Sequence, residues 1–194
     1  MATENLLPRP PFDPDIMASM LALPPTSDDL TTADIPAQRE AVEQMLSART
    51  AALLSDPSIT HTEHTIHGPR RIGASSRPSW AAGCVWSGRQ NAFGWGCLLD
   101  GSEGGADCYA APARAADLAG LPEAFVDVSS TEVFRDDAVA YVGRLLECGV
   151  QAELHVWPGG PHGFHGLAPA ARVSRAANEP QEAWVRRVLR PVGE

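Results

Sequence analysis

The pattern of apolar and polar positions is most regular in the last third of the chain. Residues 124–128 (AFVDV) form a short apolar run that is typical of a buried strand. Residues 136–148 carry apolar side chains at helical spacing, and Gly149 is suited to end this helix because glycine readily adopts the left-handed conformation. Residues 151–157 alternate apolar with polar side chains and predict a second strand.

A last helix is predicted near the end of the chain, with Asn178 as its cap and Pro180 in its first turn. Trp184, Val185 and Val188 give it an apolar side. Strand, helix, strand and helix in this order predict two parallel strands joined by a crossover helix. The fold class is therefore α/β.

The first part of the chain predicts two amphipathic helices and a strand. One helix runs from Asp13 to Leu23, with Pro14 at its start, and the second runs from Asp34 to Asp56. A short strand is predicted at residues 60–66, and a short helix at residues 89–99. We divide the chain into residues 1–67 (helices and first strand), 68–108 (irregular junction and short helix) and 109–194 (C-terminal α/β segment).

Charge and composition narrow the classes of partner. A formal net charge of -9 repels phosphate backbones, so binding of nucleic acid driven by electrostatics is not expected. No stretch approaches the ~20 apolar residues of a membrane span, and the start of the chain does not resemble a secretion signal. We expect a cytoplasmic protein that acts on a small molecule. Its cysteines, expected to be reduced, are Cys84, Cys97, Cys108 and Cys148.

Three closely spaced histidines raise the question of a metal site. His61, His64 and His67 lie in a threonine-rich stretch that predicts a strand. The period of two in a strand sends His61 and His67 to one face and His64 to the other. We therefore favour a solvated edge strand over metal binding, and no metal or cofactor is expected.

Two residues with chemically reactive side chains follow the two predicted parallel strands. Glu132 comes after the first strand and His162 after the second. The carboxyl ends of parallel strands lie at one edge of a sheet, which is where open α/β sheets place their ligands. A carboxylate that accepts from one imidazole nitrogen fixes the tautomer of the ring, as in a Ser-His-acid relay. Alternatively, Glu132 is an exposed residue near a helix N-terminus and His162 a surface histidine.

The segments that carry these residues resemble a known family. Gly120-Leu121-Pro122-Glu123, Glu132 before Arg135-Asp136-Asp137, and His162-Gly163-Phe164 resemble the end of the α/β-hydrolase fold-3 esterases, the hormone-sensitive-lipase-like group. Tyr109-Ala110-Ala111-Pro112 and the stretches RPPFDPD and ITHTEHT resemble other parts of the same proteins. The resemblance implies a carboxylic ester hydrolase with Glu132 and His162 in its catalytic triad, a small ester as substrate, and association of copies through the edge of the sheet.

The sequence departs from this family in its central part. The family carries an H-G-G-G motif for the oxyanion hole and a G-x-S-x-G nucleophile elbow, and this sequence contains neither motif. The serines nearest to such a pattern are Ser75, Ser76 and Ser102. We therefore expect an incomplete α/β-hydrolase sheet, shortened within residues 68–83, with impaired or absent turnover. The alternative is a non-catalytic remnant that binds a partner through its uncovered faces.

Overall fold

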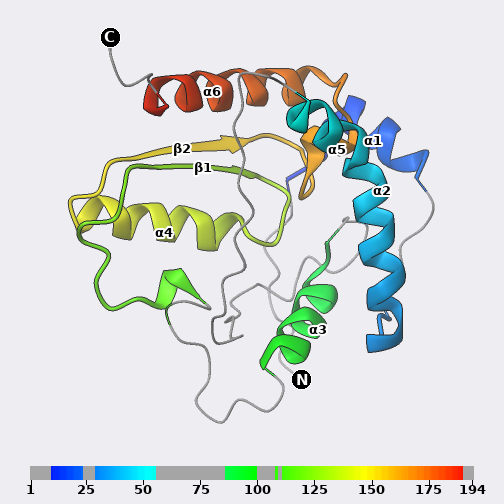
Figure 1. Ribbon diagram of the computed structural model, residues 1–194, viewed down its shortest axis with the longest axis horizontal. Helices are drawn as coiled ribbons and strands as arrows, with labels where there is room; N and C mark the ends of the chain where they lie inside the picture. The colour runs from blue at the N-terminus through cyan, green and yellow to red at the C-terminus, as the bar shows by residue number, and fades with distance from the viewer. Residues whose placement is uncertain (1–9, 24–28, 56–85, 100–107, 109–110, 190–194) are drawn as a thin grey trace.

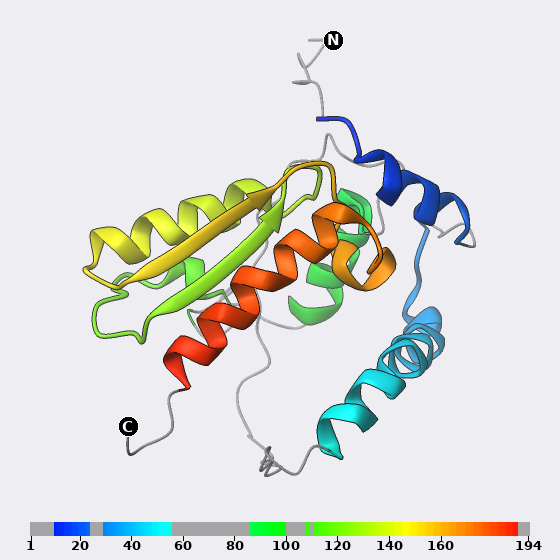
Figure 2. The ribbon, with the colours of Figure 1, turned by 90° about the horizontal axis from the view of Figure 1, so that it is seen from above.

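The computed structural model describes residues 10–23, 29–55, 86–99, 108 and 111–189. In its C-terminal part a two-stranded sheet lies between two helices, α4 on one face and α6 on the other, as Figures 1 and 2 show. The elements in chain order are α1 (Pro14–Leu21), η1 (Thr32–Asp34), α2 (Ile35–Leu54), α3 (Gly88–Leu99), η2 (Pro112–Arg114), β1 (Ala124–Ser129), α4 (Arg135–Glu147), β2 (Ala152–Trp157), α5 (Phe164–Leu167) and α6 (Arg172–Val188).

The predicted parallel pair of strands is confirmed. β1 and β2 pair in parallel, with Ala124 opposite Ala152 and Ser129 opposite Trp157. The pairing continues past the end of β1, where the Ser130 amide donates to the Trp157 carbonyl at 2.8 Å. Both chain segments that leave the strands therefore start from the same edge of the sheet.

The end of α4 shows why the crossover is well defined. Gly149 has φ +79°, as predicted for the residue after the helix, and its amide donates to the Leu146 carbonyl at 3.0 Å. The Val150 amide donates to the Leu145 carbonyl at 2.9 Å, which completes a Schellman motif. Leu145 and Val150 pack together with Leu118 in a buried cluster. The same few residues therefore end the helix and place two side chains, Leu145 and Val150, in the buried cluster.

The predicted start of the last helix is wrong. α6 begins at Arg172 rather than near Asn178, and Pro180 lies inside it. A proline in a helix interior removes one backbone hydrogen bond. Here the first turns of α6 bury Val173 and Ala177 against other apolar residues, and this burial outweighs the lost bond.

The N-terminal helix is anchored to the C-terminal part. The Asp13 carboxylate caps α1 by accepting from the Asp15 amide at 3.0 Å and the Ile16 amide at 3.3 Å. Ile16 is fully buried in a cluster with Phe164 of α5 and Ala177 of α6. Residues 10–23 therefore belong to the same core as the end of the chain.

The other sequence predictions meet the structure only in part. α2 and α3 confirm the helices predicted near residues 34–56 and 89–99. The predicted strand at residues 60–66, its three histidines and the junction at residues 68–83 lie outside the described residues. Among the helices in the described ranges, none has the length and apolar character that a membrane span requires.

Candidate active site

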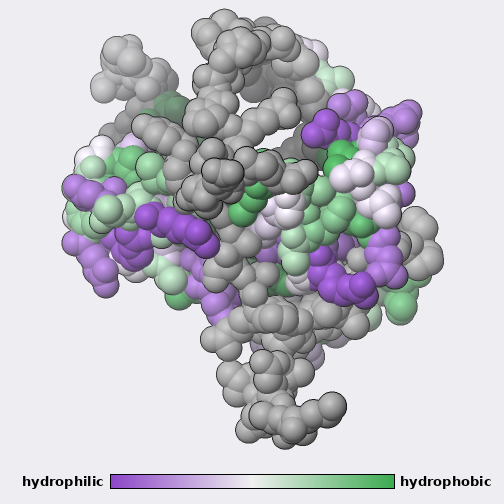
Figure 3. Space-filling view, turned by 90° about the horizontal axis from the view of Figure 1, so that it is seen from below, coloured by the Kyte–Doolittle hydropathy of each residue, from purple (hydrophilic) through white to green (hydrophobic). Residues whose placement is uncertain are grey.

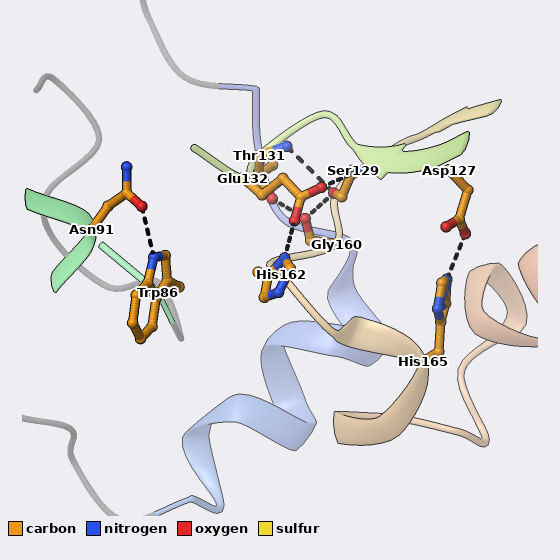
Figure 4. A network of polar contacts seen from close by, with 9 residues as sticks. All are labelled: Trp86, Asn91, Asp127, Ser129, Thr131, Glu132, Gly160, His162 and His165. Carbon is orange, nitrogen blue, oxygen red and sulfur yellow. Dashed lines mark hydrogen bonds and ion pairs between the residues drawn. The ribbon is translucent and has the colours of Figure 1, made fainter. Parts of the chain in front are cut away.

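Glu132 and His162 are in direct contact at the carboxyl edge of the sheet. The Nδ1 atom of His162 lies 2.8 Å from Oε2 of Glu132, and Figure 4 shows the two side chains pointing toward one another. An ionised carboxylate only accepts hydrogen bonds, so Nδ1 carries the hydrogen of the neutral ring. The contact expected from the two strand exits is therefore present.

The carboxylate of Glu132 is buried and fully occupied. Its side chain is 7% exposed, and Oε1 accepts from the Ser129 amide at 3.0 Å while Oε2 faces His162. A carboxylate held at both oxygens has little freedom to rotate. The last residue of β1 thus fixes the direction in which the acid presents itself to the imidazole.

The loop of residues 158–163, which carries His162, is held by hydroxyl groups at the end of β1. Ser129 and Thr131 both donate through their side chains to the Gly160 carbonyl, and the Ser130 hydroxyl accepts from the Gly159 amide at 2.9 Å. Ser129 and Thr131 are buried. Sequence reasoning missed this role, although a run of small polar residues after a buried strand is a signal that nearby backbone groups need partners.

Two glycines of the loop are required by close contacts. A Cβ atom on Gly159 would lie 2.2 Å from the Asp13 backbone nitrogen, which itself donates to the Gly159 carbonyl at 2.9 Å. A Cβ atom on Gly160 would lie 2.6 Å from Cγ of Phe164. The loop is therefore packed between α1 and α5 at van der Waals distance.

The imidazole of His162 is held on one side and open on the other. Its ring meets Phe134 edge to face, with centroids 5.1 Å apart, and the side chain is 55% exposed. Because Nδ1 faces Glu132, Nε2 is the nitrogen that offers a lone pair. Among the described residues, no hydroxyl group donates a hydrogen bond to this ring. Ser75, Ser76 and Ser102 lie outside the described residues.

A second carboxylate contacts a histidine nearby. Oδ2 of Asp127, in β1, lies 3.2 Å from Nε2 of His165, in α5. The sequence pattern did not predict this pair, because Asp127 lies inside the apolar run of the strand. Two acid–histidine contacts therefore connect the β1 side of the edge with the segment that contains α5.

A cavity of about 750 Å³ lies between α2 and α3, apart from the Glu132–His162 and Asp127–His165 pairs. Neither Glu132 nor His162 lines it. Figure 3 views the molecule from below and shows apolar residues gathered among polar ones on the face that it draws. The apolar side chains that line the cavity are Leu30, Ile35, Val42, Trp86, Phe93 and Leu98.

The chain is similar in sequence and in structure to known esterases. The chain is 44% identical over 49 residues to the esterase LipU of Mycobacterium tuberculosis, an alignment covering 25% of this chain and 16% of LipU. The structure superposes on esterase LipW from Mycobacterium marinum with a TM-score of 0.57 and 29% identity, covering 61% of this chain and 37% of LipW. A bacterial heroin esterase gives a TM-score of 0.51 and 37% identity, covering 55% and 35% of the two chains.

The matches are partial on the side of the relatives, since the chain spans well under half the length of each of these proteins. The family match is broader. A family model described as alpha/beta hydrolase fold matches residues 46–166, well over half of the 194 residues. This match confirms the family resemblance and the fold class that the sequence motifs implied. The chain belongs to the alpha/beta hydrolase fold family.

Proposed function

We propose that this chain is a carboxylic ester hydrolase of impaired turnover, in which His162 is the general base and Glu132 orients it. The observation that carries this proposal is the 2.8 Å contact between a buried carboxylate and a half-exposed imidazole. The esterase names of the similar proteins support it. The substrate class is a small ester.

Without a nucleophilic serine, Glu132 and His162 would catalyse hydrolysis by activating a water molecule. Nε2 of His162 accepts a proton from water while the water oxygen bonds to the acyl carbon and the carbonyl electrons move to oxygen. The tetrahedral intermediate then expels the alcohol oxygen, which takes the proton back from Nε2. Glu132 stabilises the imidazolium between these steps because its charge lies next to Nδ1.

The missing motifs explain why turnover should be slow. A G-x-S-x-G elbow supplies a nucleophile that is already positioned, and preorganised donors for the oxyanion are usually a large part of the rate enhancement. The sequence contains no such elbow and no H-G-G-G motif. The acid–histidine half of the triad would therefore work without the other half.

Hydrolysis of p-nitrophenyl acetate tests the proposal. We expect slow hydrolysis that falls about tenfold in His162→Ala, less than the roughly 100- to 10,000-fold typical of complete general-base sites. Glu132→Gln should also lower the rate, because the neutral amide no longer stabilises an imidazolium.

The matched control is His155→Ala. His155 also contacts a carboxylate, with Nε2 at 2.9 Å from Oε1 of Glu153, but this nitrogen is the one engaged in the pair. The control should therefore keep the wild-type rate. Equal rates in the wild type and in His162→Ala would refute the mechanism.

A second candidate function is a non-catalytic association module. Its support is the exposure of large apolar side chains, with Leu21 79% exposed and Leu189 73% exposed. Light scattering after size exclusion should then give a mass above the 20.6 kDa of one chain, and Leu21→Ser should lower that mass. A wild type that is monomeric at every concentration tested would remove this candidate.

A further inference from the structure

Asp127 and His165 form a pair whose place in the fold parallels that of Glu132 and His162. Asp127 comes from β1, the strand that leads into Glu132, and His165 comes from the turn that follows His162. Their atoms Oδ2 and Nε2 are both buried and lie 3.2 Å apart, a contact within ion-pair distance that does not have hydrogen-bond geometry. Figure 4 shows the two side chains pointing toward each other, one from the strand and one from the short helix.

The helix that carries His165 has little stability of its own. α5 spans Phe164–Leu167 and closes one turn, with the Leu167 amide donating to the Gly163 carbonyl at 3.3 Å. Such a short helix gains its order from contacts with its surroundings. Phe164, 3% exposed, and Ala168 pack in the core, and the Ser174 hydroxyl donates to the Phe164 carbonyl at 3.3 Å. These contacts hold α5 on its α6 side, and the contact of His165 with Asp127 links it to β1.

We propose that Asp127 is a positioning residue for His162, acting through His165. The contact between Asp127 and His165 holds α5 against β1 and so sets the end of the loop from which His162 meets Glu132. This inference rests on the proposed function, because it concerns the geometry of the same acid–histidine pair. It assigns Asp127 and His165 no contact with the substrate.

The burial of the pair supports an effective attraction. The side chains are 19% exposed for Asp127 and 23% exposed for His165, so salt and water screen this contact less than a contact at the surface. Asp127 also stands in an apolar strand between Val126 and Val128, where an unpaired carboxylate would be costly. A partner for its charge is therefore a physical requirement of the fold at this position.

The other charged groups on this face of the sheet are engaged with one another. Glu153 lies 2.9 Å from His155 through Oε1 and 2.7 Å from Arg187 of α6 through Oε2. His155 is the residue opposite Asp127 in the strand register. Glu153 is therefore a matched control: it is a carboxylate on the same face of the sheet, with partners in β2 and α6 rather than in the His162 segment.

The test measures the tautomer of His162 by ¹⁵N NMR of the imidazole nitrogens in the full chain. The His162 signals are assigned from their loss in His162→Gln. In the wild type we expect the form with hydrogen on Nδ1, because this nitrogen faces the carboxylate. In Asp127→Asn the ratio of the Nδ1–H form to the Nε2–H form should fall about threefold or more. Glu153→Gln should leave the ratio unchanged.

A variant of the other partner guards against a folding defect in Asp127→Asn. His165→Asn should lower the ratio to a similar degree, and the double variant should lower it no further than either single change, because both act through one contact. Wild-type ratios in Asp127→Asn or His165→Asn, or an equal fall in Glu153→Gln, would overturn the proposal. A wild type with hydrogen on Nε2 would instead overturn the Glu132–His162 pair, and with it the proposed function.

Discussion

At the scale of single residues, the carboxylate of Glu132 serves both the fold and the site. One oxygen accepts from the Ser129 amide and the other faces His162, while the side chain is almost completely buried. Removing the group would strand a buried amide, whereas changing only its charge would affect mainly the imidazole. The two functions of this carboxylate are therefore separable by substitution.

We expect Glu132→Ala to lower the free energy of unfolding by about 1 to 3 kcal/mol, the cost of leaving a buried donor without a partner. Glu132→Gln should cost less, because its amide oxygen still accepts from Ser129. Urea unfolding followed by circular dichroism measures both values. Equal losses in the two variants would show that the Ser129 bond is not the stabilising contact.

Glu153 adds a dependence on pH. The hydrogen bond from His155, and then that from Arg187, lowers the pKa of Glu153 below its ordinary value of 4.5. A carboxyl group whose pKa is lowered by folding stabilises the fold above the pKa of its unfolded state, and this contribution disappears as pH falls through the folded pKa.

Urea unfolding of the wild type and Glu153→Gln at several pH values tests this sign. The wild type should be the more stable protein near pH 6, and the difference should shrink as the pH falls below 4.5, the ordinary pKa of the group, and through the lower pKa of the folded state. Glu153→Gln serves as the reference for the wild type, since the other titrating groups are common to both proteins. A difference that grows toward acid pH would contradict the assignment.

At the scale of elements, the turn after α4 shows how one glycine ends a helix. Gly149 has φ +79°, and the Schellman motif places Val150 on Leu145. A side chain at this position is strained, although no atom crowds it within 4 Å. The cost of a substitution therefore comes from the backbone alone.

Gly149→Ala should destabilise the protein by about 1 to 2 kcal/mol, the price of the left-handed conformation for a residue with Cβ. Gly143→Ala is the matched control, because Gly143 lies inside α4 with open space around it. That change should stabilise the protein by about 0.4 to 1 kcal/mol. Thermal unfolding distinguishes the two signs, and shifts in the same direction would contradict the argument.

These elements also show what local patterns reveal. The spacing of apolar residues predicted α4 to within one residue at each end, because its stripe, its first turn and Gly149 are local features. The start of α6 was not predicted because it depends on a long-range contact. Val173 and Ala177 are buried in one cluster with Phe164, and the local sequence pattern does not reveal this cluster. The pattern of residues 124–128 predicted a buried strand but gave no partner for Asp127. That partner, His165, depends on how α5 packs against β1.

At the scale of the whole molecule, the loop that carries His162 contacts the N-terminal cap of α1 through Gly159 and Asp13. Glu132 and His162 were predicted to meet because parallel strands share one edge, which is a rule of topology. The contact of Asp13 with Gly159 follows no such rule and depends on how α1 docks. Residues of the central segment, where the family would place its nucleophile, lie largely outside the described ranges.

Gly159→Ala should weaken the docking of α1, because its Cβ would strike the Asp13 backbone. Gly163→Ala is the control: Gly163 has a similar φ of +71° but open space around it, so it carries the backbone strain without the clash. We expect the control to cost about 1 to 2 kcal/mol and Gly159→Ala to cost clearly more. Urea unfolding measures both, and limited proteolysis should cut residues 10–23 faster in Gly159→Ala alone.

The bond between Asp13 and Gly159 has a consequence for the order of events on the ribosome. α1 is made before the loop that receives it and before the α6 residues that bury Ile16. At roughly 5 to 20 residues per second, the apolar side of α1 waits on the order of ten seconds or more for its partners. During translation the apolar side of α1 is therefore without its core partners until these segments have emerged.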